Sequence, residues 1–197
     1  MDVLKWVLVS TAIEGGIMKQ FNEYVRNYFS FLQDYGYINL CENLENNISF
    51  VGKNNRLDIS FSVIGYELTC QFVDNDKNTF TLQDGLEYVK VKEIKGSYQI
   101  AHKEEIEKGI AYLAEAVKTL FLEINIADDA NFQKIFQYRL DMNKELLEEY
   151  YFKTDIKKAE ECWKNREYAK AQKLFEKHIG ILSKAQLRKL EYIRENT

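Results

Sequence analysis

The chain has 197 residues, 46% of them apolar and 29% charged, and its 27 basic and 31 acidic side chains give a net charge of −4 with neutral histidines. This apolar share supports a sizeable buried core and excludes a wholly disordered or low-complexity protein. The charge balance lacks the basic excess that is typical of nucleic-acid-binding proteins.

Residues 1–17 have two competing interpretations. Glu14-Gly15-Gly16-Ile17-Met18 can be encoded by a bacterial ribosome-binding sequence followed by a start codon, so residues 1–17 are a translated leader if Met18 is the natural start. Otherwise they supply an extra strand at Val3–Val9. A signal peptide fits less well, because Asp2 disrupts the positive n-region and the apolar run is short.

An amphipathic helix opens the next part of the chain. From Met18 to Tyr35 the apolar side chains recur at three- and four-residue steps, which predicts one helix. Gly36 suits the helix end because glycine tolerates a positive φ. Residues 41–47 are dense in Asn and Glu and indicate a polar link.

Alternating apolar and polar residues then predict an antiparallel sheet with one wet face. Three to four strands fit the pattern: Ile48–Phe50, Arg56–Val63, Tyr66–Phe72 and Thr79–Leu82. Residues 84–91 fit either a brief helix or a further strand, and residues 95–100 are interpreted as a connection.

The chain after residue 101 is predicted to be helical. Residues 103–124 carry one apolar stripe, and Asp128 or Asp129 is a candidate cap for the next helix. Thr154 and Ser183 are candidate N-caps for later helices. We therefore predict an α+β protein, with an N-terminal α/β part at 18–100 and a bundle of about four to five helices at 101–197.

Residues 155–180 resemble one helical hairpin of the tetratricopeptide type. Trp163, Tyr168, Ala171 and Phe175 stand at spacings similar to those of its second helix. No second copy appears at a 34-residue period, which excludes a superhelical array. A helix pair that closes its own core is the simpler explanation.

The C-terminal tail is mildly basic. Residues 155–197 hold 11 basic and 7 acidic side chains, which leaves a net charge of −8 for residues 1–154. The tail is therefore a candidate nucleic-acid surface, but its interleaved glutamates favour a solvated face of ion pairs.

Two patterns partly match metal sites. Asp74-x-Asp76-x-Asn78 begins like a calcium loop, but Thr79 and Gly85 replace the glycine and the glutamate that the loop requires. Turn chemistry explains the Asp and Asn residues without an ion. His102 precedes Glu105, and Glu176 precedes His178, but two distant histidines do not make a zinc site. We expect no metal and no cofactor.

The sequence contains no recognisable signature of catalysis or of a membrane span. Cys41, Cys70 and Cys162 show no C-x-x-C spacing, and such a sparse, odd set favours a reducing cytoplasm. No stretch approaches the roughly 20 apolar residues of a membrane span. Local signatures of a nucleophile or of a phosphate-binding loop are missing from the sequence. We expect a cytoplasmic protein.

The element order resembles small bacterial immunity proteins, which neutralise toxins of rival strains. The residues that carry this resemblance are Phe31-Leu32-x-x-Tyr35-Gly36-Tyr37, the strand pair Leu57–Val63 and Tyr66–Phe72, and Phe80–Asp84, within residues 18–125. The resemblance implies a protein that covers a toxin's active site with an acidic or shape-matched surface.

The leading hypothesis is a non-enzymatic interaction protein that binds and inhibits or sequesters a protein partner. Toxin immunity or phage anti-defence is the expected setting, and homo-oligomers are compatible with it. The predicted partner-binding residues are Asp58, Glu67, Gln71, Asp74 and Asp76. The alternatives are a hydrolase or transferase that uses His102 or His178 with carboxylates, and nucleic-acid binding through the basic C-terminal helices.

Overall fold

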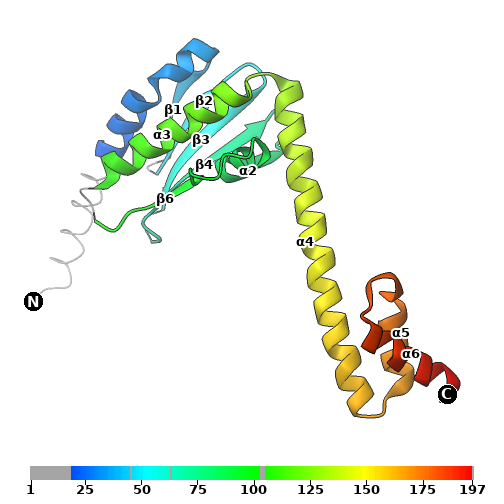
Figure 1. Cartoon of the computed structure of the whole chain (residues 1–197). Coiled ribbons are helices and arrows are strands. Elements are labelled where there is room, and N and C mark those ends of the chain that lie inside the picture. The colour runs from blue at the N-terminus through cyan, green and yellow to red at the C-terminus, as the bar shows by residue number, and fades with distance from the viewer. Residues whose placement is uncertain (1–18, 45, 63, 103–104, 197) are drawn as a thin grey trace, which may run out of the picture. The chain divides into compact units, whose positions relative to one another are not determined.

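The computed structural model describes residues 19–44, 46–62, 64–102 and 105–196. The leader or strand predicted at residues 1–17 lies outside these ranges. The described chain is an α+β structure with a six-stranded antiparallel sheet (Figure 1). It divides into two compact units, one extending to Arg139 and the other beginning at Leu140.

The N-terminal helix is shorter than predicted. Residues 19–28 are α-helical, and a 3-10 helix, η1 (Ser30–Tyr35), follows after Phe29. Phe29 and Leu32 are both fully buried, and the three-residue repeat of a 3-10 helix keeps them on one side. Gly36 ends the segment as predicted, with a φ of 80° and its N–H directed at the carbonyls of Leu32 and Gln33.

The sheet contains more strands than the three to four predicted. Its strands are β1 (Ile38–Leu44), β2 (Asn47–Val51), β3 (Asn55–Ser62), β4 (Glu67–Asp74), β5 (Thr79–Thr81) and β6 (Ser97–Gln99). The first five lie in chain order, and β5 and β6 share one edge of β4. All pairs are antiparallel.

Two segments predicted as connections are strands. Residues 41–44 of the predicted polar link lie in β1 and Asn47 begins β2, and the connection at 95–100 contains β6. β1 lies at the end of the strand order, where one neighbour suffices and polar residues are tolerated. β6 has three residues, too few to show periodicity.

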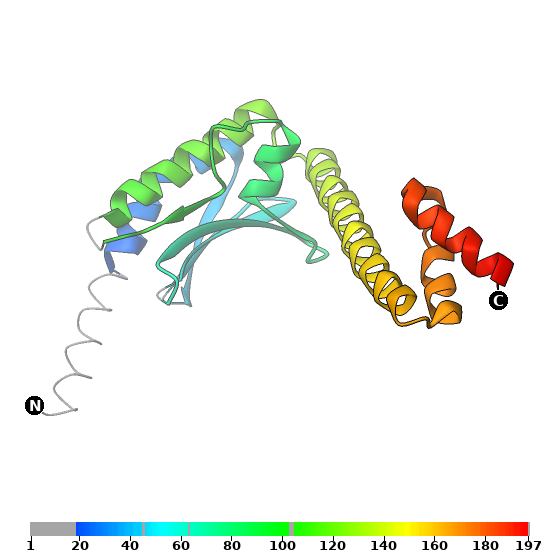
Figure 2. The same ribbon diagram turned by 60° about the horizontal axis from the view of Figure 1, so that its bottom comes forward.

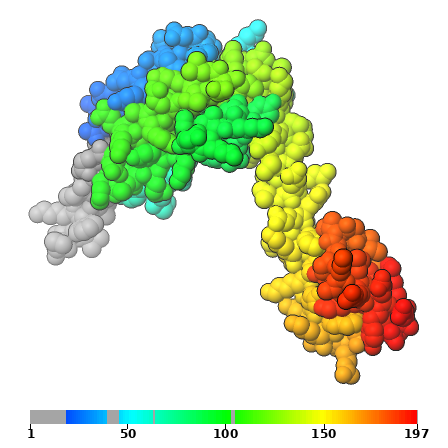
Figure 3. Space-filling view, viewed as in Figure 1, coloured from blue at the N-terminus to red at the C-terminus, as the bar shows by residue number. Residues whose placement is uncertain are grey.

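Helices cover one face of the sheet (Figures 2 and 3). This inner face carries the buried members of the alternating strands, among them Leu57, Ile59, Leu68 and Phe72. The open choice at 84–91 resolves mainly as a helix, α2 (Leu82–Tyr88), which begins with a capping box between Thr81 and Asp84.

The helix α3 (Ile106–Glu123) belongs to the sheet unit and not to a separate C-terminal bundle. It buries Ile110, Leu113, Val117 and Leu120, which join the same hydrophobic cluster as the inner face. The division between units therefore falls at 139/140 instead of the predicted 100/101. Periodicity identifies a helix but does not say which element it packs against.

Residues 106–196 contain α3, three further α-helices and one short 3-10 helix, in line with the four to five helices predicted after residue 101. The helix α4 (Asp129–Lys164) continues through Thr154, where a new helix was expected to start, and no Gly or Pro interrupts it. It enters the second unit at Leu140 and is followed by α5 (Tyr168–Glu176), η3 (Ile179–Ile181) and α6 (Lys184–Asn196). Ser183 caps α6 as predicted, since its Oγ accepts the N–H of Gln186.

The end of α4 and α5 form the predicted hairpin, which α6 completes. Ala159 of α4 packs with Ala171 and Phe175 of α5, and Leu190 and Ile193 of α6 close the same buried cluster. Among the described residues, no helix combines the length and hydropathy needed to cross a bilayer.

Candidate functional site

The second face of the sheet, called here the outer face, carries the wet positions of the strands. Strand register aligns Ser49 with Asp58, Asp58 with Gln71, and Gln71 with Thr81, and in the next row Val51 with Arg56 and Arg56 with Val73. The outer face comprises Asn47, Ser49, Val51, Arg56, Asp58, Ser60, Ser62, Glu67, Thr69, Gln71, Val73, Thr79 and Thr81. Within the described ranges no helix packs over it (Figure 2).

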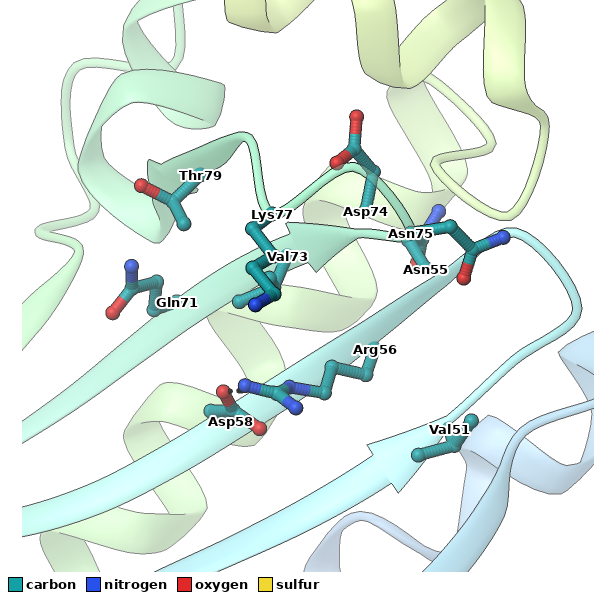
Figure 4. A pocket seen from close by; sticks show the side chains of 10 residues that line it. All are labelled: Val51, Asn55, Arg56, Asp58, Gln71, Val73, Asp74, Asn75, Lys77 and Thr79. Atoms are coloured by element: carbon teal, nitrogen blue, oxygen red, sulfur yellow. Dashed lines mark hydrogen bonds and ion pairs between the residues drawn. The ribbon is translucent and has the colours of Figure 1, made fainter.

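A hollow of about 510 Å³ lies at one end of the outer face (Figure 4). It sits where β3 begins and β4 ends, beside the turn that leads to β5. Its lining residues are Val51, Asn55, Arg56, Asp58, Gln71, Val73, Asp74, Asn75, Lys77 and Thr79.

Asp58 is fixed by two neighbours on the outer face. Ser49 Oγ donates to Asp58 Oδ1 at 2.6 Å, and Arg56 Nε donates to Oδ2 at 3.0 Å. Asp58 is 8% exposed, whereas the Arg56 side chain is 51% exposed. Both carboxylate oxygens thus have a donor, and the carboxylate orients the Arg56 side chain.

Asp74 has a structural role in the turn between β4 and β5. Its Oδ1 accepts the N–H groups of Asp76 and Asn78, and its Oδ2 accepts the side-chain amides of Asn78 and Gln133. Burial opposes ionisation, but these four donors together lower the pKa of Asp74 below its ordinary value. Its carboxylate points away from Arg56 (Figure 4). The predicted turn chemistry is therefore present.

The other three predicted residues are separated. Gln71 is exposed in the hollow opposite Asp58, and Asp76 is exposed in the adjacent turn. Glu67 lies at the other end of β4, opposite Ser62 and roughly 13 Å from Gln71 along the strand. The structure thus gathers Asp58, Gln71 and Asp74 around the hollow and leaves Glu67 and Asp76 outside its lining.

Sequence reasoning missed two cations of the hollow, Arg56 and Lys77. The alternation placed Arg56 on the wet face, which was a usable signal, but four of the five predicted partner-binding residues are acidic and none is basic. Lys77 lies inside the Asp74–Asn78 turn with a φ of 66°. This left-handed conformation is uncommon for lysine, so the sequence does not predict it.

The two histidines differ in their surroundings. His102 is exposed just before α3. His178 follows α5, and its Nε2 lies 2.9 Å from Asp155 Oδ2 with the side chain 12% exposed. Lys177 Nζ contacts the same oxygen at 2.6 Å. These contacts join α4 to the end of α5.

The remaining candidates for catalysis or nucleic-acid binding are either buried or paired with neighbouring side chains. Cys70 is buried, and burial raises the pKa of its thiol, so it does not supply a thiolate. In the basic tail, Lys170 pairs with Glu167, Lys189 with Glu160 and Arg194 with Glu176. This arrangement is the ion-paired face that the interleaved charges favour.

Comparison with known proteins gives no indication of function. No family model matches the chain, and neither a curated protein nor a solved structure matches it.

Proposed function

We propose that the chain is a binding protein that engages a protein partner through the outer face and acts by inhibiting or sequestering it. The observation that carries the proposal is an antiparallel sheet with helices on its inner face and a hollowed outer face, lined by small polar and paired charged side chains. Bacterial conflict, as toxin immunity or phage anti-defence, is the setting that the resemblance to immunity proteins implies.

The occupied reactive groups support this proposal over catalysis. Asp58 and Asp74 serve the sheet and its turn, and the Cys70 thiol is buried. Carboxylates that already have partners suit recognition, because binding then leaves few of them desolvated without a partner.

A hydrolase or transferase is the second candidate, and one contact favours it. His178 lies within hydrogen-bond distance of Asp155, as in an oriented general base. However, Lys177 shares that carboxylate oxygen, and the group joins two helices of the second unit. The conservative variant His178→Gln separates the candidates, because it should leave partner capture unchanged if the outer face is the site.

The proposal is tested by capturing the products of neighbouring genes on the purified full chain. Thr69 lies exposed near the centre of the outer face, so Thr69→Arg should reduce recovery of the bound product at least about tenfold by steric and charge mismatch. Asn27→Arg adds the same charge at an exposed position of the N-terminal helix and should bind like wild type.

Two results would contradict the outer-face proposal. One is capture that Asn27→Arg and Thr69→Arg weaken equally. The other is the absence of any specific product in the wild-type eluate when the neighbouring genes are co-expressed.

A further inference from the structure

The hollow on the outer face has unused positive charge. Of its carboxylates, Asp58 is bonded to Ser49 and Arg56, and Asp74 is bonded within its turn and to Gln133. The cations are used less. Among the described residues, Arg56 bonds only through Nε, and Lys77 makes no side-chain ion pair. Of the charged groups, those left for a ligand are therefore donors.

Arg56 is oriented for a second anion. Asp58 holds its Nε at 3.0 Å, and Ser49 holds Asp58 from the neighbouring strand. The terminal nitrogens of a guanidinium fixed in this way form a planar fork that matches a carboxylate. Figure 4 shows the guanidinium lying along the strand beside Asp58, within the hollow that Gln71 also lines.

Lys77 is presented by a turn whose backbone is fixed. The N–H of Lys77 donates to the carbonyl of Asp74 at 3.1 Å, while the Asp74 side chain holds both Asp76 and Asn78. Lys77 itself adopts a φ of 66°, which costs a non-glycine residue roughly 1 kcal/mol or more. Such a cost at a residue lining a hollow is a reason to look for a function of its side chain.

We infer that this hollow binds one exposed carboxylate, a glutamate or aspartate side chain of the protein partner, between Arg56 and Lys77. The inference rests on the proposed function and names the partner's chemistry at that site. Charge favours a carboxylate over a phosphate: Arg56 and Lys77 balance Asp58 and Asp74, so the charged lining sums to about zero. A carboxylate with one negative charge is then repelled less by the two resident carboxylates than a phosphate dianion is. Val51 and Val73 line the same hollow and can pack against the methylene groups of the incoming side chain.

The test is a titration of the isotopically labelled full chain, followed by NMR of backbone amides and of arginine Nε. The probes are the blocked tripeptide Gly-Glu-Gly, its neutral match Gly-Gln-Gly, and inorganic phosphate. We expect Gly-Glu-Gly to shift Arg56 Nε and the amides of residues 76–78, with a millimolar dissociation constant. Gly-Gln-Gly should bind at least about fivefold more weakly.

Variants localise the site. Arg56→Gln and Lys77→Gln should each weaken Gly-Glu-Gly binding at least about fivefold. Lys77→Gln keeps the Arg56–Asp58 pair, so it remains informative if Arg56→Gln perturbs the fold. Lys53→Gln removes a cation from the turn between β2 and β3 and should bind like wild type.

The outcomes separate this inference from the proposed function. Equal binding of the two tripeptides, tighter binding of phosphate, or no loss in Lys77→Gln would overturn the carboxylate site, even if capture remains sensitive to Thr69→Arg. If Gly-Glu-Gly binds and Lys77→Gln weakens that binding, the carboxylate site is supported. This holds even if partner capture fails and the proposed function is refuted.

Discussion

Asp58 and Asp74 occupy positions that sequence patterning assigns to solvent or a turn, yet each is 8% exposed. Asp58 obtains its partners from β2 and its own strand, which the alternation pattern makes foreseeable. Asp74 obtains one donor from Gln133, 59 residues further along the chain. No local pattern predicts that contact, because it depends on how α4 begins. The acidic surface expected from the sequence therefore carries fewer available carboxylates than its composition implies.

Asp74 should contribute to stability in a pH-dependent way. Asp74→Asn should lower the free energy of unfolding by about 2 kcal/mol at pH 7, because donors bonded to a charged acceptor lose it. The folded-state pKa of Asp74 is below its ordinary value, so this contribution is complete above about pH 4 and is lost as the pH falls through the folded-state pKa. Urea denaturation at pH 7 and pH 3 measures the difference, which should shrink at pH 3.

The neighbouring variant Asp76→Asn is the control for Asp74→Asn. Asp76 lies in the same turn but its side chain is exposed. Its substitution should change the free energy of unfolding by less than about 0.5 kcal/mol. A loss in Asp74→Asn that is the same at both pH values would contradict the assigned pKa.

Among the elements, those with long repeating patterns are predicted best. β3 and β4 lie within about two residues of their predicted ends, since eight-residue strands show clear alternation. β1 and β6 were missed because one is polar and the other too short. α4 was divided at Thr154 because a residue with capping propensity also fits a helix interior. These failures come from tertiary pairing, which local propensity does not contain.

The packing of α3 on the sheet depends on a close approach at Gly109. A Cβ there would lie 2.7 Å from Leu68 Cδ1 and 2.7 Å from Tyr98 Cδ1. Gly109→Ala gains about 1 kcal/mol of helix propensity but must displace two packed side chains, at about 1–3 kcal/mol. We expect a net loss of about 1 kcal/mol in the free energy of unfolding, measured by urea denaturation.

Gly180→Ala provides the matched comparison for Gly109→Ala. No atom lies within 4 Å of a Cβ built at Gly180. This substitution should leave stability unchanged or raise it by about 0.5 kcal/mol. If Gly109→Ala proved as stable as Gly180→Ala, the close packing of α3 on β4 and β6 would be refuted.

For the whole molecule, the main feature is the presence of two separate hydrophobic clusters. One joins the inner face to α2, α3 and the start of α4, and the other joins the end of α4 to α5 and α6. The sequence predicts that the N-terminal part is α/β and that the C-terminal part is helical. It does not reveal the division at 139/140, because the apolar stripe of α3 looks the same whether it faces a sheet or a helix.

Hydrogen exchange should show the two clusters as distinct cooperative regions. Phe175 is fully buried in the second cluster, so Phe175→Ala should lower the protection of α5 and α6 amides by about 3–5 kcal/mol. The amides of β3 and β4 should keep their protection. The reciprocal variant Phe132→Ala removes a fully buried side chain of the first cluster and should have the opposite distribution. Equal loss throughout the chain in both variants would show one cooperative unit.

The hairpin tip between β3 and β4 is a suitable site for attaching a label. Ile64 is 99% exposed there. The tip lies beyond Glu67, the first residue of β4, which is roughly 13 Å along the strand from Gln71, the first residue of β4 that lines the hollow. A fluorescent dye coupled at this tip would report tumbling, and hence complex formation by anisotropy, without occupying the surface on which a ligand would settle.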